Sequence, residues 1–232
     1  LNKIQPVRGT TDLYASEMQV YRKVINDAKL VSELFGYEEA SFPIFEKDEV
    51  FSRPLGHSSD VVSKETYTFN DRGGERITLR PEGTAGIMRS ILSEGKTNDL
   101  PLKLFYSGPM FRYERPQKGR LRQFIQIGIE NIGNHSPLED AEVIACGASL
   151  LKRLGFNKDC VLNLNSLGDT ESRNLYRKSL VEYFSKNLEK LSQLSQSRLS
   201  LNPLRILDSK EPQDQEIINN APLYSSYLNN SS

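Results

Sequence analysis

The fold is decided by residues 102–132, which read LKLFYSGPMFRYERPQKGRLRQFIQIGIENI. Strand-like runs over 102–106 and 110–115 lead into a turn at 116–119, and 123–132 then alternates apolar with polar residues. Alternation with a period of two is typical of a half-buried strand. The stretch therefore predicts a β-hairpin whose returning strand has two different faces. Its isoleucines face the core, and its other face carries Gln126, Gly128 and Glu130.

The polar face of this hairpin is a candidate ligand site. Gln126 and Glu130 share one face of the returning strand, and Gly128 between them is expected to leave the surface open. Arg112 and Glu114, two residues apart, are predicted to share one face of the outgoing strand. A sheet whose polar face only meets solvent gives the same alternation, so the pattern leaves both interpretations open.

The connection between the two strands is strongly basic, with Glu114 as its one carboxylate. Its cationic residues are Arg112, Arg115, Lys118, Arg120 and Arg122. Guanidinium groups bind phosphate oxygens in a forked geometry that lysine lacks. The loop therefore predicts a clamp for phosphate or an RNA backbone, with a solvated basic turn as the alternative.

A second hairpin precedes the first. Residues 66–70 and 76–80 alternate around a glycine-bearing turn at 71–74, and residues 83–93 then predict a short helix. Glu82 and Thr84 stand at the strand–helix junction, where they are suited to hold an ammonium group. They also have the composition of a helix cap, which is the structural alternative.

Helices are predicted around these strands. Ser16 opens a capping box before a helix over 15–35, and a second box at 136–139 opens a helix that runs to about 154. Residues 160–165 predict a strand, and helical patterns rich in Ser, Asn, Gln, Leu and Lys follow from 171. The expected fold is α+β, with an antiparallel sheet and flanking helices over 1–157 and a smaller, mostly helical module over 158–232.

Composition excludes several classes of protein. The 232 residues carry 30 Lys+Arg and 30 Asp+Glu, and this zero net charge excludes a uniformly basic nucleic-acid binder. No apolar run reaches the roughly 18–20 residues of a membrane span. Two cysteines exclude a disulfide scaffold and indicate a cytoplasmic protein, and two distant histidines, His57 and His135, form no metal-ligand cluster. GxxxxGK and GxGxxG loops are absent, so an ATP site would have to use arginines.

Several blocks resemble the histidyl-tRNA synthetase family of class II aminoacyl-tRNA synthetases. Residues 111–124 are similar to the second class II motif, and residues 36–43 are similar to the first. Further similar blocks lie at 8–12, 79–84, 163–168 and 202–210. The resemblance implies that 1–157 is a class II catalytic core with motifs 1 and 2, and that 158–232 begins a module inserted before motif 3. Motif 3 and the anticodon-binding domain of the family do not occur before Ser232.

The resemblance also implies an activity and its residues. L-histidine and ATP with Mg²⁺ would form histidyl-adenylate, whose histidyl group passes to tRNA(His), and the motif 1 region would form a homodimer. The implied histidine-binding residues are Glu82, Thr84, Gln126 and Glu130. The implied ATP-binding residues are Arg112, which is also the catalytic residue at the α-phosphate, Glu114 and Arg120. No protein-bound metal is implied, and the chain alone is expected to have little activity.

Two other functions compete with this one. The synthetase-like regulatory subunit of ATP phosphoribosyltransferase, in histidine biosynthesis, is a non-catalytic relative. The presence of Glu82, Arg112, Glu114 and Arg120 together favours the enzyme. A stand-alone RNA-binding module is favoured by the basic loop only.

Overall fold

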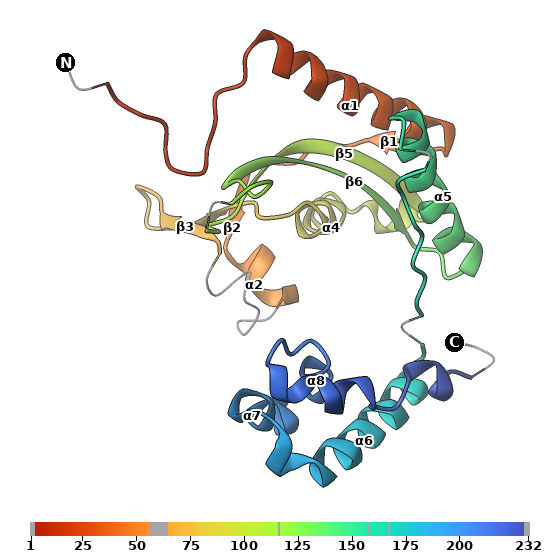
Figure 1. The fold of residues 1–232 in the computed structure, drawn as a ribbon. Coiled ribbons are helices and arrows are strands. Elements are labelled where there is room, and N and C mark those ends of the chain that lie inside the picture. The colour runs from red at the N-terminus through yellow and green to blue at the C-terminus, as the bar shows by residue number, and fades with distance from the viewer. Residues whose placement is uncertain (1–2, 56–64, 116, 157, 167, 230–232) are drawn as a thin grey trace. The chain divides into compact units, whose positions relative to one another are not determined.

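The structure is a computed structural model that describes residues 3–55, 65–115, 117–156, 158–166 and 168–229 (Figure 1). The chain forms two compact units, Leu1–Cys160 and Val161–Ser232. Each unit has a core of its own and is described by itself below.

The main sheet of the first unit is built on a long hairpin. Strands β5 (Leu102–Phe111) and β6 (Gln123–Ile132) pair antiparallel along their whole length, which confirms the predicted hairpin. The two-residue strand β1 (Glu38–Glu39) lies on the other side of β5 and pairs with it in parallel. The sheet order is therefore β1-β5-β6, an antiparallel sheet with one parallel strand added.

The outgoing strand ends earlier than predicted. β5 stops at Phe111, so Arg112 and Glu114 lie in the connecting loop, and the prediction that they share a strand face was wrong. The Arg112 amide still donates to the Arg122 carbonyl at 2.9 Å. The Glu114 amide instead folds back onto the Arg112 carbonyl at 2.8 Å, which ends the ladder.

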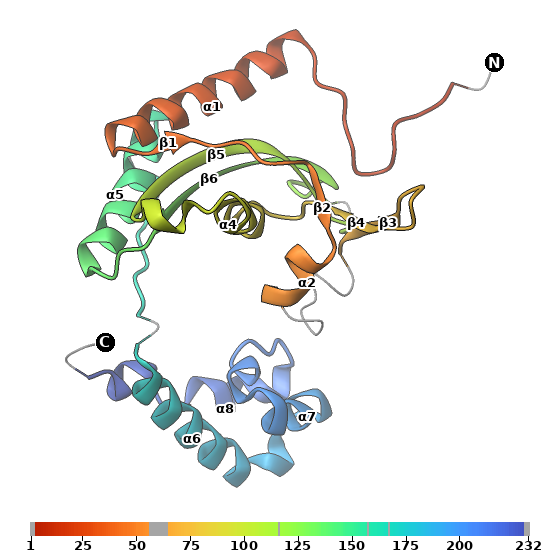
Figure 2. The same ribbon diagram turned by 180° about the vertical axis from the view of Figure 1, so that it is seen from behind.

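Helices cover both faces of this sheet, as Figures 1 and 2 show from opposite sides. Helices α1 (Ala15–Leu34) and α5 (Pro137–Arg153) lie on one face, and α4 (Thr84–Ser93) lies on the other. The two faces have separate hydrophobic clusters. Phe105 belongs to the α1–α5 cluster and its neighbour Tyr106 to the α4 cluster, because successive side chains of a strand point to opposite faces.

The isoleucine side chains of β6 point toward a hydrophobic core, as predicted. Ile127 and Ile129 pack against the α1–α5 cluster. By alternation Gln126, Gly128 and Glu130 therefore lie on the α4 face of the sheet.

The caps predicted for the helices are observed in some cases and not in others. α1 begins after Tyr14, whose amide donates to the Glu17 carboxylate at 3.1 Å, so the prediction that Ser16 caps this helix was wrong. Gly36 follows the helix with φ +79°, the left-handed conformation that glycine readily adopts at a helix C-terminus. Ser136 does cap α5, accepting from the Leu138 amide at 3.3 Å.

A second, smaller sheet lies beside the first. Strands β3 (Tyr67–Asn70) and β4 (Arg76–Leu79) form the predicted hairpin, and β2 (Phe45–Lys47) pairs with the other side of β4. The sheet order is β2-β4-β3. Helix α2 (Glu49–Leu55) follows β2, and the 3-10 turn η1 (Lys96–Asp99) follows α4. The three residues of β2 are too few for an alternation pattern, so the sequence did not predict this strand.

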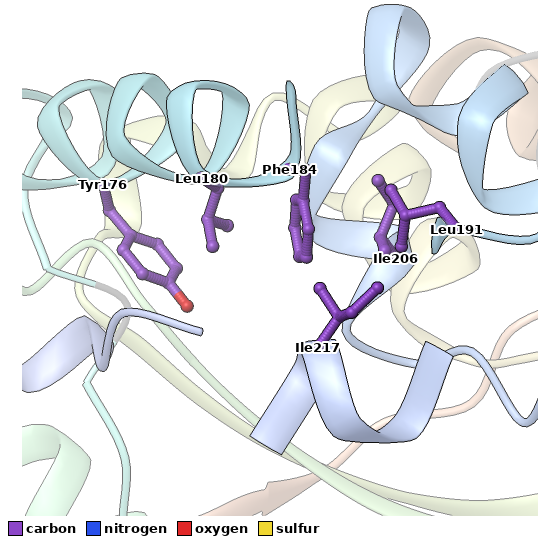
Figure 3. Close-up of a cluster of buried hydrophobic side chains, with 6 residues drawn as sticks. All are labelled: Tyr176, Leu180, Phe184, Leu191, Ile206 and Ile217. Carbon is purple, nitrogen blue, oxygen red and sulfur yellow. The ribbon is translucent and has the colours of Figure 1, made fainter. Parts of the chain in front are cut away.

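The second unit is helical. It contains α6 (Thr170–Lys186), α7 (Gln193–Leu201) and α8 (Pro212–Asn219), with 3-10 turns η2 (Leu188–Lys190), η3 (Pro203–Ile206) and η4 (Tyr224–Tyr227). Six buried side chains form its core (Figure 3). They are Tyr176, Leu180, Phe184, Leu191, Ile206 and Ile217.

The strand predicted over 160–165 does not form. The segment has no regular secondary structure, and its apolar residues Val161, Leu162 and Leu164 are exposed. An alternating pattern becomes a strand only where a partner strand satisfies the hydrogen bonds of its backbone.

Among the described helices, none combines the length and apolar character that crossing a membrane requires.

Candidate functional site

The α4 face of the main sheet brings together residues that are far apart in the sequence. The Thr84 hydroxyl, at the start of α4, donates to a Glu130 carboxylate oxygen on β6 at 2.7 Å. Gln126 lies on the same face of β6, on the other side of Gly128. The structure thus groups Thr84, Gln126 and Glu130 where the N-terminus of α4 meets the edge strand β6 of the sheet.

Glu82 caps the helix at this point. Its carboxylate accepts from the Thr84 amide at 2.6 Å and from the Ala85 amide at 3.0 Å. This is the structural role that its position in the sequence left open. A carboxylate has about four acceptor positions. Glu82 therefore keeps acceptor capacity for a cationic group in addition to its capping bonds.

Tyr106 is a central residue of the site that the sequence did not reveal. The β5–β6 register places it opposite Gly128, and its ring is sandwiched between Gly128 and Gly83. A Cβ atom at either glycine would overlap the ring. The expectation that Gly128 leaves the sheet surface open was therefore wrong, because the Tyr106 ring fills that space.

The Tyr106 hydroxyl lies among the predicted site residues. It accepts a hydrogen bond from Gln126 Nε2 at 3.2 Å. Burial, and then the charge of Glu130, raise the pKa of Tyr106 to about 12, against the effect of a hydrogen bond with Thr84. The phenol is therefore protonated and available as a donor at neutral pH.

The site is rich in acceptors. Burial raises the pKa of Glu130, and the charge of Glu82 acts in the same direction, while hydrogen bonds with Thr84 and Tyr106 oppose the rise. The side-chain oxygen of Gln126 is buried and has no hydrogen-bond partner within the described residues. Two carboxylates beside a free carbonyl oxygen form an environment that a donor with positive charge would satisfy.

Two arginines fix the strand ends around this face. Arg80 is buried, and its guanidinium donates to the carbonyls of Pro109 at 2.9 Å and Phe42 at 2.8 Å. Burial lowers the pKa of Arg80. Arg112 donates from Nε to the Pro81 carbonyl at 2.9 Å, so its guanidinium is held next to the segment that carries Glu82.

Several described residues of the basic loop make contacts within the loop or with the N-terminal segment. Arg120 forms an ion pair with Glu114 at 3.2 Å, and both line a cavity of about 330 Å³. The Arg122 guanidinium lies 4.0 Å from the centre of the Tyr113 ring and donates to the Glu114 carbonyl. The Arg122 amide donates to the Gly9 carbonyl at 2.7 Å, which ties the N-terminal segment to the loop. Arg120 and Arg122 are therefore both paired within the loop.

A larger hollow of about 1330 Å³ lies along α2 and α4 and reaches Glu82 and Thr84.

Of the two histidines, His135 is described but His57 lies outside the described residues. Within the described part of the chain, no group of three or more His, Cys, Asp or Glu side chains is arranged to hold a metal ion.

Comparison with known proteins identifies the family. The family model described as "Histidyl-tRNA synthetase" matches residues 9–201. The chain belongs to the histidyl-tRNA synthetase family. The resemblance seen in the sequence blocks is thereby confirmed, and with it the class II fold expected for this family.

Curated relatives support the same assignment. The chain is similar to the "Histidine--tRNA ligase" of Gluconobacter oxydans, with 54% identity over 100% of this chain and 56% of the relative. It is 53% identical to the protein of that name from Gluconacetobacter diazotrophicus, over 98% of this chain and 55% of the relative. The chain thus spans little more than half the length of these histidyl-tRNA synthetase relatives.

Solved structures agree on the fold. The apo S. aureus histidyl-tRNA synthetase superposes with a TM-score of 0.75 at 35% identity, covering 98% of this chain and 51% of that one. A Bacillus halodurans structure titled as an ATP phosphoribosyltransferase regulatory subunit/histidyl-tRNA synthetase gives a TM-score of 0.60 over 97% of this chain and 66% of that one. At 22% identity, this second likeness shows the fold alone.

Proposed function

We propose that this chain is the part of a histidine–tRNA ligase that binds L-histidine and positions ATP. The complete reaction joins L-histidine to ATP as histidyl-adenylate and then transfers the histidyl group to tRNA(His). The observation that carries the proposal is the acceptor-rich cluster of Glu82, Gln126 and Glu130, with the Arg112 guanidinium held beside it at Pro81.

The cluster supports binding of a histidine molecule. Glu82, Thr84 and Gln126 offer acceptors for the α-ammonium group, and the free Gln126 oxygen is one that a bound ammonium would satisfy. Glu130 accepts from an imidazole N–H. A site built to hydrogen-bond its substrate rejects amino acids that lack the matching donor, because its polar groups would then be left unpaired.

The loop supports binding of the nucleotide. The Nε of Arg112 donates a hydrogen bond to the Pro81 carbonyl. The two terminal nitrogens of the guanidinium therefore remain available to bind phosphate oxygens. The histidine carboxylate attacks the α-phosphorus in line, and Arg112 stabilises the charge that develops there. Glu114 and Arg120 line the neighbouring cavity, where Glu114 accepts from the adenine amino group. Mg²⁺ enters with the phosphates of ATP.

The architecture fits a class II core followed by an insertion. We assign 1–157 to the catalytic core with motifs 1 and 2, and 158–232 to the start of the module between motifs 2 and 3. Exposed apolar side chains on α1, the helix that leads into the motif 1 segment at 36–43, support a homodimer through this region; among them are Val20, Leu30 and Leu34. Both cysteines are free, in keeping with a cytoplasmic enzyme.

A hybrid enzyme tests this function. Residues 1–232 would be continued by the remainder of the Gluconobacter oxydans histidine–tRNA ligase, to which they are 54% identical. We expect the hybrid to catalyse histidine-dependent exchange of pyrophosphate into ATP, and the 232-residue chain alone to show little exchange. A hybrid that binds histidine but forms no adenylate would instead support the regulatory subunit.

The hybrid needs two controls. Alanine as the amino acid should support no exchange. The hybrid carrying Glu130→Gln should show much less exchange than the unaltered hybrid at the histidine concentration that half-saturates the unaltered hybrid. A hybrid that folds, as judged by circular dichroism, but neither binds histidine nor forms adenylate would overturn the proposal.

A further inference from the structure

We propose that Tyr106 is a positioning residue that orients the side-chain amide of Gln126, so that the amide oxygen faces the bound substrate. The inference rests on the proposed histidine site and adds to it the group that sets its selectivity for a protonated amine. Tyr106 itself is buried beneath the site, with 2% of its surface exposed, and acts through its neighbours.

The orientation follows from the number of protons available. A tyrosine hydroxyl has one proton to donate, and an ionised carboxylate is an acceptor only. The phenol proton is directed toward Thr84 and Glu130, and Thr84 itself gives its only hydroxyl proton to Glu130, so the phenol oxygen can only accept from Gln126. The amide nitrogen of Gln126 must therefore face Tyr106, as the 3.2 Å Nε2–Oη distance shows, and its oxygen is left without a partner.

The position of the hydroxyl is fixed by packing. The ring is sandwiched between Gly83 and Gly128, and the Phe42 ring meets it edge-on with centroids 5.5 Å apart. A side chain packed in this way has one rotamer available. The hydroxyl cannot turn away from Gln126 and Glu130, so the orientation of the amide is set before any ligand binds.

The chemical consequence is a preference for cations. A buried oxygen without a donor has a free-energy cost that a ligand N–H removes. If the Gln126 amide were reversed, its two N–H donors would face the ammonium group and repel it. The Tyr106 hydroxyl thus distinguishes the α-ammonium group of an amino acid from a ligand that lacks it.

The first test needs no ligand. In Tyr106→Phe the hydroxyl is lost, so the pKa of Glu130, followed by ¹³C NMR of glutamate-labelled protein, should rise. Thr84 still donates to Glu130 in this variant, and the other charges that face these groups, Glu82 and Arg80, are unaltered. Tyr37→Phe is the matched control, because Tyr37 has the same 2% exposure but packs in the α1–α5 cluster.

An unchanged Glu130 pKa in Tyr106→Phe would overturn the inference, since the phenol proton would then not be directed toward Thr84 and Glu130. An equal rise in Tyr37→Phe would overturn it as well. That result would attribute the change to a general loosening of the sheet.

The second test measures ligand selectivity by calorimetry. Tyr106→Phe should weaken L-histidine binding about tenfold, the contribution of one net hydrogen bond. Binding of 3-(imidazol-4-yl)propionate, which lacks the amine, should change by less than twofold. Gln126→Leu should give a similar selective loss, and the double variant should lose little more than Gln126→Leu alone.

Additive losses in the double variant would overturn the inference, because Tyr106 would then not act through Gln126. The two tests also separate this inference from the proposed function. If the unaltered chain binds no histidine while the Glu130 pKa responds to Tyr106→Phe, the proposed function fails and the hydrogen-bond arrangement stands.

Discussion

Glu130 is a partly buried charged residue. Its substitution is expected to affect the binding of histidine and the binding of ATP to different extents. Glu130→Gln keeps an acceptor for the Thr84 hydroxyl but removes the negative charge. We expect histidine affinity to fall about 10- to 100-fold, the range for a hydrogen bond to a charged group, and ATP affinity to stay within about twofold. Calorimetric titration with each ligand gives the comparison. Equal losses for both ligands would show that the roles are assigned wrongly.

The raised pKa of Glu130 also makes the ligand-free protein sensitive to pH. The folded state holds the proton at a pH where the unfolded chain, with an ordinary value near 4.5, has released it. Stability therefore falls as pH rises through the window from 4.5 to the folded pKa. Glu130→Gln cannot ionise, so its Tm should exceed that of the unaltered protein at pH 7. The difference should disappear at pH 4 in scanning calorimetry, and a difference that is constant with pH would contradict this account.

Arg112 is expected to affect the rate of adenylate formation more than the binding of histidine. Arg112→Lys offers one nitrogen, which cannot both reach the Pro81 carbonyl and form a fork with phosphate. In the hybrid enzyme, single-turnover adenylate formation should slow about 100- to 1,000-fold. Histidine affinity should be unchanged. Arg115→Lys, in the same loop, is the control and should stay within about threefold; an equal loss there would indicate a general effect of loop charge.

At the scale of the elements, the glycine opposite Tyr106 decides whether β6 can carry the site. Gly128→Ala would drive a methyl group into the Tyr106 ring, and we expect a loss of roughly 1–3 kcal/mol in the free energy of unfolding. Gly147→Ala is the control, because that helical position in α5 has open space for a Cβ atom and should be neutral or stabilised by up to about 1 kcal/mol. Urea denaturation measures both, and equal stabilities for the two variants would contradict the packing.

Periodicity predicted the elements better than it predicted their ends and partners. The isoleucines of β6 identified the strand and its buried face, since alternation is a local property. The partner of Gly128 depends on the β5–β6 register, which no local pattern contains, and so Tyr106 was missed. Arg112 and Glu114 left the strand because the loop folds back on itself one residue after Phe111. The three-residue β2 was too short to recognise.

The site residues themselves came from the resemblance of sequence blocks to a family. The structure adds that Thr84 meets Glu130 across 46 positions of the chain. It also shows that Glu82 caps α4, a role that the sequence offered only as an alternative. Contacts between distant segments are set by tertiary packing, which is why the sequence could propose these residues but not their geometry.

At the scale of the whole molecule, the two units have different determinants of stability. The helical unit is tied together by Asp214, which is fully buried and accepts from the hydroxyls of Ser192, Ser195 and Ser209 at 2.6–2.8 Å. Burial alone would raise the pKa of Asp214, but these bonds together with the Ser192 amide outweigh it and hold the pKa below its ordinary value of 3.8. The charged form therefore stabilises this unit above pH 3.8, and the stabilisation is lost as pH falls below it.

We expect Asp214→Asn to destabilise the helical unit by roughly 2–4 kcal/mol, because buried hydroxyl donors lose a charged acceptor. Hydrogen exchange resolves the two units. Amides of α6, α7 and α8 should lose protection in the variant, while those of β5, β6 and α5 should keep it. Equal loss in both units would show that they unfold as one. As pH falls below 3.8, the unaltered helical unit should move toward the behaviour of the variant.

The sandwich of Tyr106 between Gly83 and Gly128 also restricts the order in which this sequence can change over evolutionary time. A larger residue at position 83 or 128 is excluded while the ring is present, but becomes permissible once position 106 has become small. The reverse step, restoring an aromatic residue, is then blocked until both glycines return. The effects of substitutions at these three positions, which are up to 45 places apart in the chain, therefore depend on one another. Substitutions at them are tolerated in one order only.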